Sequence, residues 1–89
     1  MMIRKHIVFR GQVQGVGFRY RAGMGAHEAG CTGWARNEYD GSVSMEIQGT
    51  EQQIASVIRT IADGRFVHIE SMDVTEIPVK EGEKGFGAY

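Results

Sequence analysis

The stretch GQVQGVGFR, residues 11–19, contains the residue types of an anion-binding site. Gly15 and Gly17 can take backbone angles closed to other residues, and they let an anion approach the main-chain amides closely. Arg19 follows with a planar, permanently charged guanidinium that matches the oxygens of a phosphoryl group. If a helix begins here, its first amides have no intrahelical partner. The pattern predicts that the amides of residues 14–19 and Arg19 together hold a tetrahedral oxyanion.

The same stretch also fits an ordinary strand-to-helix turn that carries one solvated arginine. It lacks the Lys and Ser/Thr that end a Walker loop, and it is not the GxGxxG pattern of dinucleotide-binding loops. On the spacing of these residues alone, an anion site and a plain turn both remain open.

The elements that must position this stretch follow the order strand, helix, strand, strand, helix, strand. The strands are predicted over residues 2–10, 31–37, 42–48 and 65–79, and the helices over 19–29 and 50–64. Thr50 and Gln53 form a capping box at the start of the second helix. This order is the split βαβ arrangement of the ferredoxin-like fold, an α+β βαββαβ sandwich with an antiparallel sheet and two helices on one face. The glycine-rich tail, residues 81–89, is expected to add at most a short edge strand.

Two elements are recognised from the spacing of their larger side chains. The first helix shows Tyr20, Met24 and His27 at spacings of four and three, and it is predicted to end at Gly30. The last long strand is predicted to point these side chains inward: Val67, Ile69, Met72, Val74 and Ile77.

Length and composition indicate one ordinary globular domain over residues 1–89. Hydrophobic residues make up 42% of the chain and charged residues 24%, far from the composition of disordered segments. The formal net charge of -1 lacks the positive excess typical of nucleic-acid-binding proteins. No apolar run reaches the roughly 18 residues of a membrane span. We therefore expect a cytoplasmic monomer without a nucleic-acid or membrane partner.

The potential metal ligands are scattered over the predicted elements. His6, His27 and His68 fall on separate elements and show no metal-ligand spacing. Cys31 is the only cysteine, so it excludes an internal disulfide, and it is interpreted as a core thiol. The sequence predicts neither a metal site nor a cofactor.

Two long motifs resemble the signature stretches of the acylphosphatase family, small ferredoxin-like enzymes that hydrolyse carboxyl-phosphate anhydrides without a metal. They are GQVQGVGFR, residues 11–19, and GWARNEYDGSVSMEIQG, residues 33–49, and the likeness runs in register over residues 5–64. The resemblance implies that Arg19 binds the phosphoryl group and that Asn37 positions the attacking water. It also implies a phosphate cradle made by Gln14, Gly15, Val16, Gly17 and Phe18. The expected substrate is a small acyl phosphate.

Some features leave alternatives open. Glu38, where relatives often carry a small hydroxyl residue, either repels an anionic substrate or points to solvent. The carboxylate of Tyr89 is a candidate partner for Arg19 in the empty site. Two other functions also fit the motifs: a non-enzymatic ferredoxin-like module that binds anions or regulates, and the N-terminal acylphosphatase-like domain of a carbamoyl-transferring hydrogenase-maturation protein.

Overall fold

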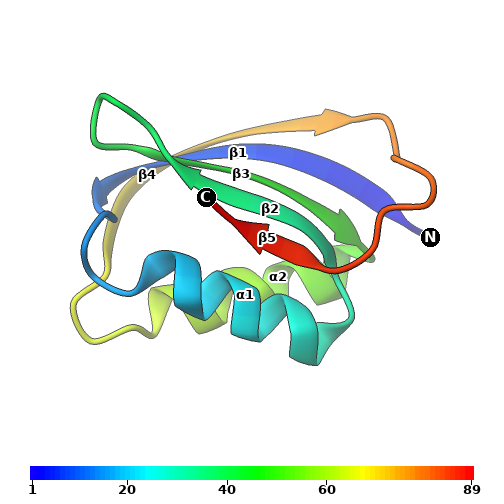
Figure 1. Cartoon of the computed structure of the whole chain (residues 1–89), viewed down its shortest axis with the longest axis horizontal. Helices are drawn as coiled ribbons and strands as arrows, with labels where there is room; N and C mark the ends of the chain where they lie inside the picture. Colours follow the sequence, from blue (N-terminus) through cyan, green and yellow to red (C-terminus); the bar gives the residue numbers. More distant parts are fainter.

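The computed structural model describes residues 1–89 and places two helices against one face of a five-stranded sheet (Figure 1). The elements in chain order are β1 (Ile3–Gln12), α1 (Phe18–Ala29), β2 (Thr32–Asn37), β3 (Val43–Gly49), α2 (Glu51–Ala62), β4 (His68–Ile77) and β5 (Phe86–Ala88). Across the sheet the strands lie in the order β4-β1-β3-β2-β5. The predicted ferredoxin-like α+β fold is confirmed. The expected edge strand is β5, and it pairs with β2 in parallel while the other pairs are antiparallel.

The core lies between the sheet and the helices. Alternate residues of the two central strands are fully buried on the helix side: Ile7, Phe9, Val43, Met45 and Ile47. Helix α2 adds Ile54, Val57 and Ile61 from one side of its surface, as its apolar spacing predicts. Its predicted capping box is present, because Thr50 Oγ1 accepts from the Gln53 N–H and Gln53 Oε1 accepts from the Thr50 N–H.

After Phe18 in its first turn, helix α1 buries small residues rather than large ones. Its buried residues are Phe18, Ala22, Gly25 and Ala26. A Cβ atom on Gly25 would lie 3.2 Å from the Thr60 Cβ of α2, so the two helices approach closely at this glycine. Tyr20 and Met24 lie outside this contact, and Tyr20 is 75% exposed. Their spacing identified the helix correctly, but it did not identify the buried side.

Strand β4 is far more exposed than the sequence predicts. Met72 and Val74 pair with Phe9 and Ile7 and therefore share the helix-facing side of the sheet. Ile77 pairs with Arg4 and lies on the outer face, so the prediction that it points inward is wrong. Met72 and Val74 point inward as predicted, but they remain 37% and 48% exposed. The reason is position, because β4 is the outermost strand and the buried side chains of the two helices lie against the strands inside it.

A glycine allows β2 and β3 to approach each other at the start of the second motif. Gly33 has a φ of 144°, and a Cβ atom there would lie 1.9 Å from the main-chain oxygen of Glu46. Rotation of a side chain cannot relieve this contact, because the backbone alone fixes the positions of the Cβ and of the main-chain oxygen. The glycine of the GW pair is therefore required by the strand pairing.

We expect Gly33→Ala to lower the free energy of unfolding by about 2–4 kcal/mol, because the new Cβ forces β2 away from β3. Gly23→Ala is the matched control, since a Cβ at Gly23 meets nothing within 4 Å. At this helical position alanine should stabilise the protein by roughly 0.5–1 kcal/mol. Urea unfolding followed by circular dichroism measures both changes, and equal effects of the two substitutions would contradict the steric explanation.

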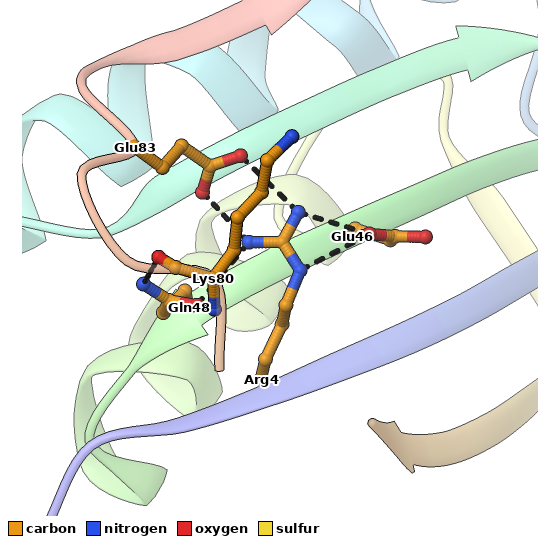
Figure 2. A network of polar contacts seen from close by, with 5 residues as sticks. All are labelled: Arg4, Glu46, Gln48, Lys80 and Glu83. Carbon is orange, nitrogen blue, oxygen red and sulfur yellow. Dashed lines mark hydrogen bonds and ion pairs between the residues drawn. The ribbon is translucent and has the colours of Figure 1, made fainter. Parts of the chain in front are cut away.

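A buried arginine secures the connection between β4 and β5 over the solvent face of the sheet (Figure 2). Arg4 is 2% exposed although its neighbours His6 and Val8 on the same face are only half-buried. Its Nη1 donates to Glu83 Oε1 at 2.7 Å, and its Nη2 donates to Glu46 Oε1 at 2.9 Å. The guanidinium thereby links β1, β3 and the segment that leads into β5.

The side chain of Gln48 holds the same connection between β4 and β5 at Lys80, which precedes Glu83 in the chain. Its Nε2 donates to the Lys80 main-chain oxygen at 2.9 Å, and its Oε1 accepts from the Lys80 N–H at 2.8 Å. Burial alone would raise the pKa of Glu83, but the hydrogen bond and charge of Arg4, with smaller contributions from Thr32 and Lys80, lower this pKa below its ordinary value. A carboxylate with a lowered folded-state pKa stabilises the fold above its unfolded pKa.

Glu83→Gln should therefore lower the free energy of unfolding by about 1–3 kcal/mol at neutral pH, because it removes one charge from the Arg4 network. The difference from the unchanged protein should shrink as the pH falls below about 4.5, where this carboxyl is protonated in the unfolded chain, and should level off once the pH passes below its lowered pKa in the folded protein. Denaturant unfolding at several pH values measures this, with Glu81→Gln as a control at an exposed neighbouring carboxylate. A destabilisation that persists unchanged at low pH would refute the ionic contribution.

Candidate active site

The glycine-rich loop leaves the end of β1 and opens α1 at its N-terminus. Gly15 and Gly17 have φ angles of 72° and 83°, in the left-handed region that favours glycine. Gly17 is the N-cap of α1 and supplies no side-chain hydrogen bond, and the first turn contains no acidic residue. A Cβ at either glycine would meet nothing within 4 Å, so the space beside the loop is open. The free amides and the positive end of the helix suit an anion.

Arg19 and the end of β2 meet at one oxygen atom. The main-chain oxygen of Tyr89 accepts a hydrogen bond from Arg19 Nη1 at 2.7 Å and another from the Asn37 N–H at 3.4 Å. The expected contact between Tyr89 and Arg19 is thus present. No carboxylate side chain forms an ion pair with Arg19, whereas Arg4, Arg10 and Arg36 each have one. An anion that binds Arg19 must therefore share or displace its contact with the Tyr89 oxygen.

Asn37 ends β2 and is half-buried. It is in register with Val43, whose side chain faces the helices, so Asn37 lies on the side of the sheet where α1 begins. The carboxamide of Asn37 makes no hydrogen bond within the protein. Its acceptor oxygen and two donor hydrogens are therefore free to bind water or a substrate.

Gln14 joins the loop to the β2–β3 hairpin. Its Nε2 donates to the main-chain oxygen of Glu38 at 2.8 Å and to that of Ser42 at 2.9 Å. The sequence placed Gln14 in the cradle through its position in the motif, but no sequence signal indicated that its side chain holds the hairpin. Both donors of the carboxamide are used, so the loop and the residues after Asn37 are fixed together.

Glu38 points its charge away from an anion held by the loop. Its Oε2 accepts from Ser44 Oγ and from Arg36 Nε, the latter at 3.0 Å. These hydrogen bonds, that of Ser44 first, lower the pKa of Glu38 below its ordinary value. Arg36 and Ser44 pair with each other across β2 and β3 on the face opposite the helices. Of the two alternatives from the sequence, the structure favours a carboxylate turned to the outer face.

The cysteine lies where the sequence predicts it, and the potential metal ligands do not converge. Cys31 is buried, and burial raises the pKa of its thiol, so the interpretation as a core thiol is confirmed. His6 packs edge-on against Trp34 on the outer face, with ring centres 6.4 Å apart. No three His, Cys, Asp or Glu side chains lie close enough to hold a metal ion.

No helix has the length and apolar character needed to cross a membrane.

The fold and this edge of the sheet define a small ferredoxin-like α+β domain with an open, cationic loop site. The acylphosphatase family model matches residues 5–88. An acylphosphatase of Clostridium beijerinckii is 40% identical over 86 residues, which are 96% of this chain and 96% of that protein. The chain therefore belongs to the acylphosphatase family of enzymes, and hydrolysis of acyl phosphates is its reaction in general terms.

Solved structures agree with this assignment. The crystal structure of acylphosphatase from Bacillus subtilis superposes with a TM-score of 0.87 at 33% identity, covering 100% of this chain and 99% of that one. The structure of full-length HypF in its phosphate- and nucleotide-bound form gives a TM-score of 0.87 at 30% identity. It covers 100% of this chain but only 12% of the HypF chain.

The position of Gln14 generates a prediction about the loop. Gln14→Glu replaces two donors by a carboxylate that faces two carbonyl oxygens, so we expect a loss of about 1–3 kcal/mol in the free energy of unfolding at neutral pH. Gln12→Glu introduces the same charge at an exposed position nearby and should change stability little. Chemical denaturation compares the two variants, and equal losses would mean that charge alone, rather than the lost hydrogen bonds, is responsible.

Proposed function

We propose that the chain hydrolyses small acyl phosphates to a carboxylate and inorganic phosphate, with the phosphoryl group held by the amides of residues 14–19 and by Arg19. Asn37 would orient the attacking water. The observation that carries the proposal is the single main-chain oxygen of Tyr89 that binds both the Arg19 guanidinium and the Asn37 N–H. The shared oxygen supports the proposal because it brings Arg19, in the first turn of α1, close to Asn37, at the end of β2.

The proposed reaction needs few catalytic groups. Water attacks phosphorus, the bond between phosphorus and the acyl oxygen breaks, and that oxygen leaves as a carboxylate. The conjugate acid of such a leaving group has a pKa of about 4–5, so it needs little help from a general acid. What remains is to neutralise the charge on the phosphoryl oxygens and to hold the water in line with the breaking bond.

The proposed roles follow from the chemistry of the two side chains. Arg19 supplies a fixed positive charge and a planar pair of donors to the phosphoryl oxygens. Asn37 can accept a hydrogen bond from the water through its carboxamide oxygen, but it cannot act as a base at neutral pH. The proton of the water therefore passes to a phosphoryl oxygen or to solvent.

Alanine substitutions should separate the two roles. Arg19→Ala should raise the inhibition constant for inorganic phosphate and lower kcat by about 100- to 1000-fold, because a charge that stabilises the phosphoryl oxygens is lost. Asn37→Ala should lower kcat by roughly 100-fold with little change in phosphate inhibition, since water orientation is lost while the cradle remains. Steady-state hydrolysis of benzoyl phosphate with a chelator present measures both constants.

Arg59→Ala serves as the control, because Arg59 is exposed on α2 and forms no ion pair. Full turnover by Asn37→Ala would remove the proposed water-orienting role. Phosphate binding without any hydrolysis by the unchanged protein would instead favour the non-enzymatic anion-binding module. The HypF likeness supports the other alternative, a domain of a larger chain, although the match extends over 96% of the Clostridium protein.

A further inference from the structure

A groove of about 760 Å³ borders the glycine-rich loop on the side of β4. One wall is the end of β1 with the first half of the loop, residues 11–16. The other is the link between α2 and β4 with the first residue of β4, residues 65–68, and Gly41 of the β2–β3 hairpin also lines the groove. The groove shares Gln14, Gly15 and Val16 with the proposed phosphate cradle, so a ligand held by that cradle adjoins it.

The order of the strands places this groove opposite Asn37. Strand β1, which carries the loop, lies between β3 and β4, while β2 lies beyond β3. Phe9 and Asn37 both pair with Val43, and Gln12 pairs with His68, so these strand ends share one edge of the sheet (Figure 1). Asn37 stands on one side of the loop, and residues 65–68 stand on the other.

The geometry of in-line displacement indicates where the acyl group of the substrate lies. The attacking water and the leaving oxygen lie on opposite sides of the phosphorus atom. If Asn37 holds the water on the β2 side, the acyl oxygen departs toward β4. The acyl group bonded to that oxygen then extends into the groove.

The side chains of the groove favour a particular kind of acyl group. Arg65 is its only permanently charged residue, and no carboxylate side chain lines it. Phe66 is 67% exposed, and the Arg65 guanidinium lies 5.6 Å from the centre of its ring. An exposed aromatic ring beside a cation can contact a flat or apolar carbon skeleton and bind a negative charge at its far end.

We infer that this groove is the acyl-group subsite and that Arg65 and Phe66 favour aromatic acyl phosphates with a second anionic group. The inference deepens the proposed function and rests on it, because the direction of the acyl group depends on Asn37 holding the water. Phe66 contacts the carbon skeleton of the substrate, and Arg65 pairs with its distal carboxylate.

The test compares benzoyl phosphate with 4-carboxybenzoyl phosphate, which differ only in the distal carboxylate. Arg65→Ala should lower the ratio of kcat/KM for the carboxylated substrate to that for benzoyl phosphate by about two- to fivefold, the range of an exposed ion pair. The ratio should stay unchanged in Arg59→Ala, which removes the same charge from a helix surface outside the groove. The inhibition constant for inorganic phosphate should be unchanged in both variants.

A second variant examines the aromatic contact. Phe66→Ala should raise KM for benzoyl phosphate more than for acetyl phosphate, whose acyl group is too small to gain from the ring. An unchanged substrate ratio in Arg65→Ala, or an equal fall in Arg65→Ala and Arg59→Ala, would overturn the subsite while leaving the proposed hydrolysis intact. If the unchanged protein hydrolysed neither benzoyl phosphate, 4-carboxybenzoyl phosphate nor acetyl phosphate, the proposed function itself would be overturned.

Discussion

The pairing of β1 and β2 with the same strand is the constraint on which the site depends. Both run antiparallel to β3, so both point in the same direction and end at the same edge of the sheet. The loop after β1 and Asn37 at the end of β2 meet there without any long connection. Gln14 then ties that loop to the hairpin, and β5 brings Tyr89 to Arg19. The common direction of β1 and β2 therefore brings the loop and Asn37 to the same edge of the sheet.

Three arginines outside the glycine-rich loop are paired with carboxylates, whereas Arg19, just after that loop, has no carboxylate side chain as a partner. On the outer face, Arg4 and Arg36 are neutralised by Glu46, Glu83 and Glu38. Arg19 contacts the main-chain oxygen of Tyr89, and no carboxylate side chain forms an ion pair with it. With a net charge of -1, the protein has no general attraction for anions, so the proposed binding of a phosphoryl group would depend on local groups such as Arg19 and the loop amides.

Sequence reasoning succeeded where local rules decide the structure. The Thr50 cap and the left-handed Gly30 depend on neighbouring residues, and both are observed. In β3 the apolar residues are buried as the alternation predicts, but Ser44 and Gln48 between them are buried as well. It failed where the burial of a side chain depends on residues far away in the sequence. Burial of Met72 and Val74 depends on how far the helices extend across the sheet. No local pattern indicates that Arg4 is buried, because its burial depends on Glu83, 79 positions away. The two motifs indicated Arg19 and Asn37, but the hydrogen bonds of Gln14 had no local signature.

The last strand has a practical consequence for handling the protein. Strand β5 is short and pairs with β2 alone, and the oxygen of Tyr89 lies against the arginine of the site. Purification tags or fusion partners joined after Tyr89 must leave through this opening and compete with incoming ligands. The first residue, Met1, is fully exposed and lies at the opposite end of the sheet (Figure 1), so attachments there leave the entrance clear.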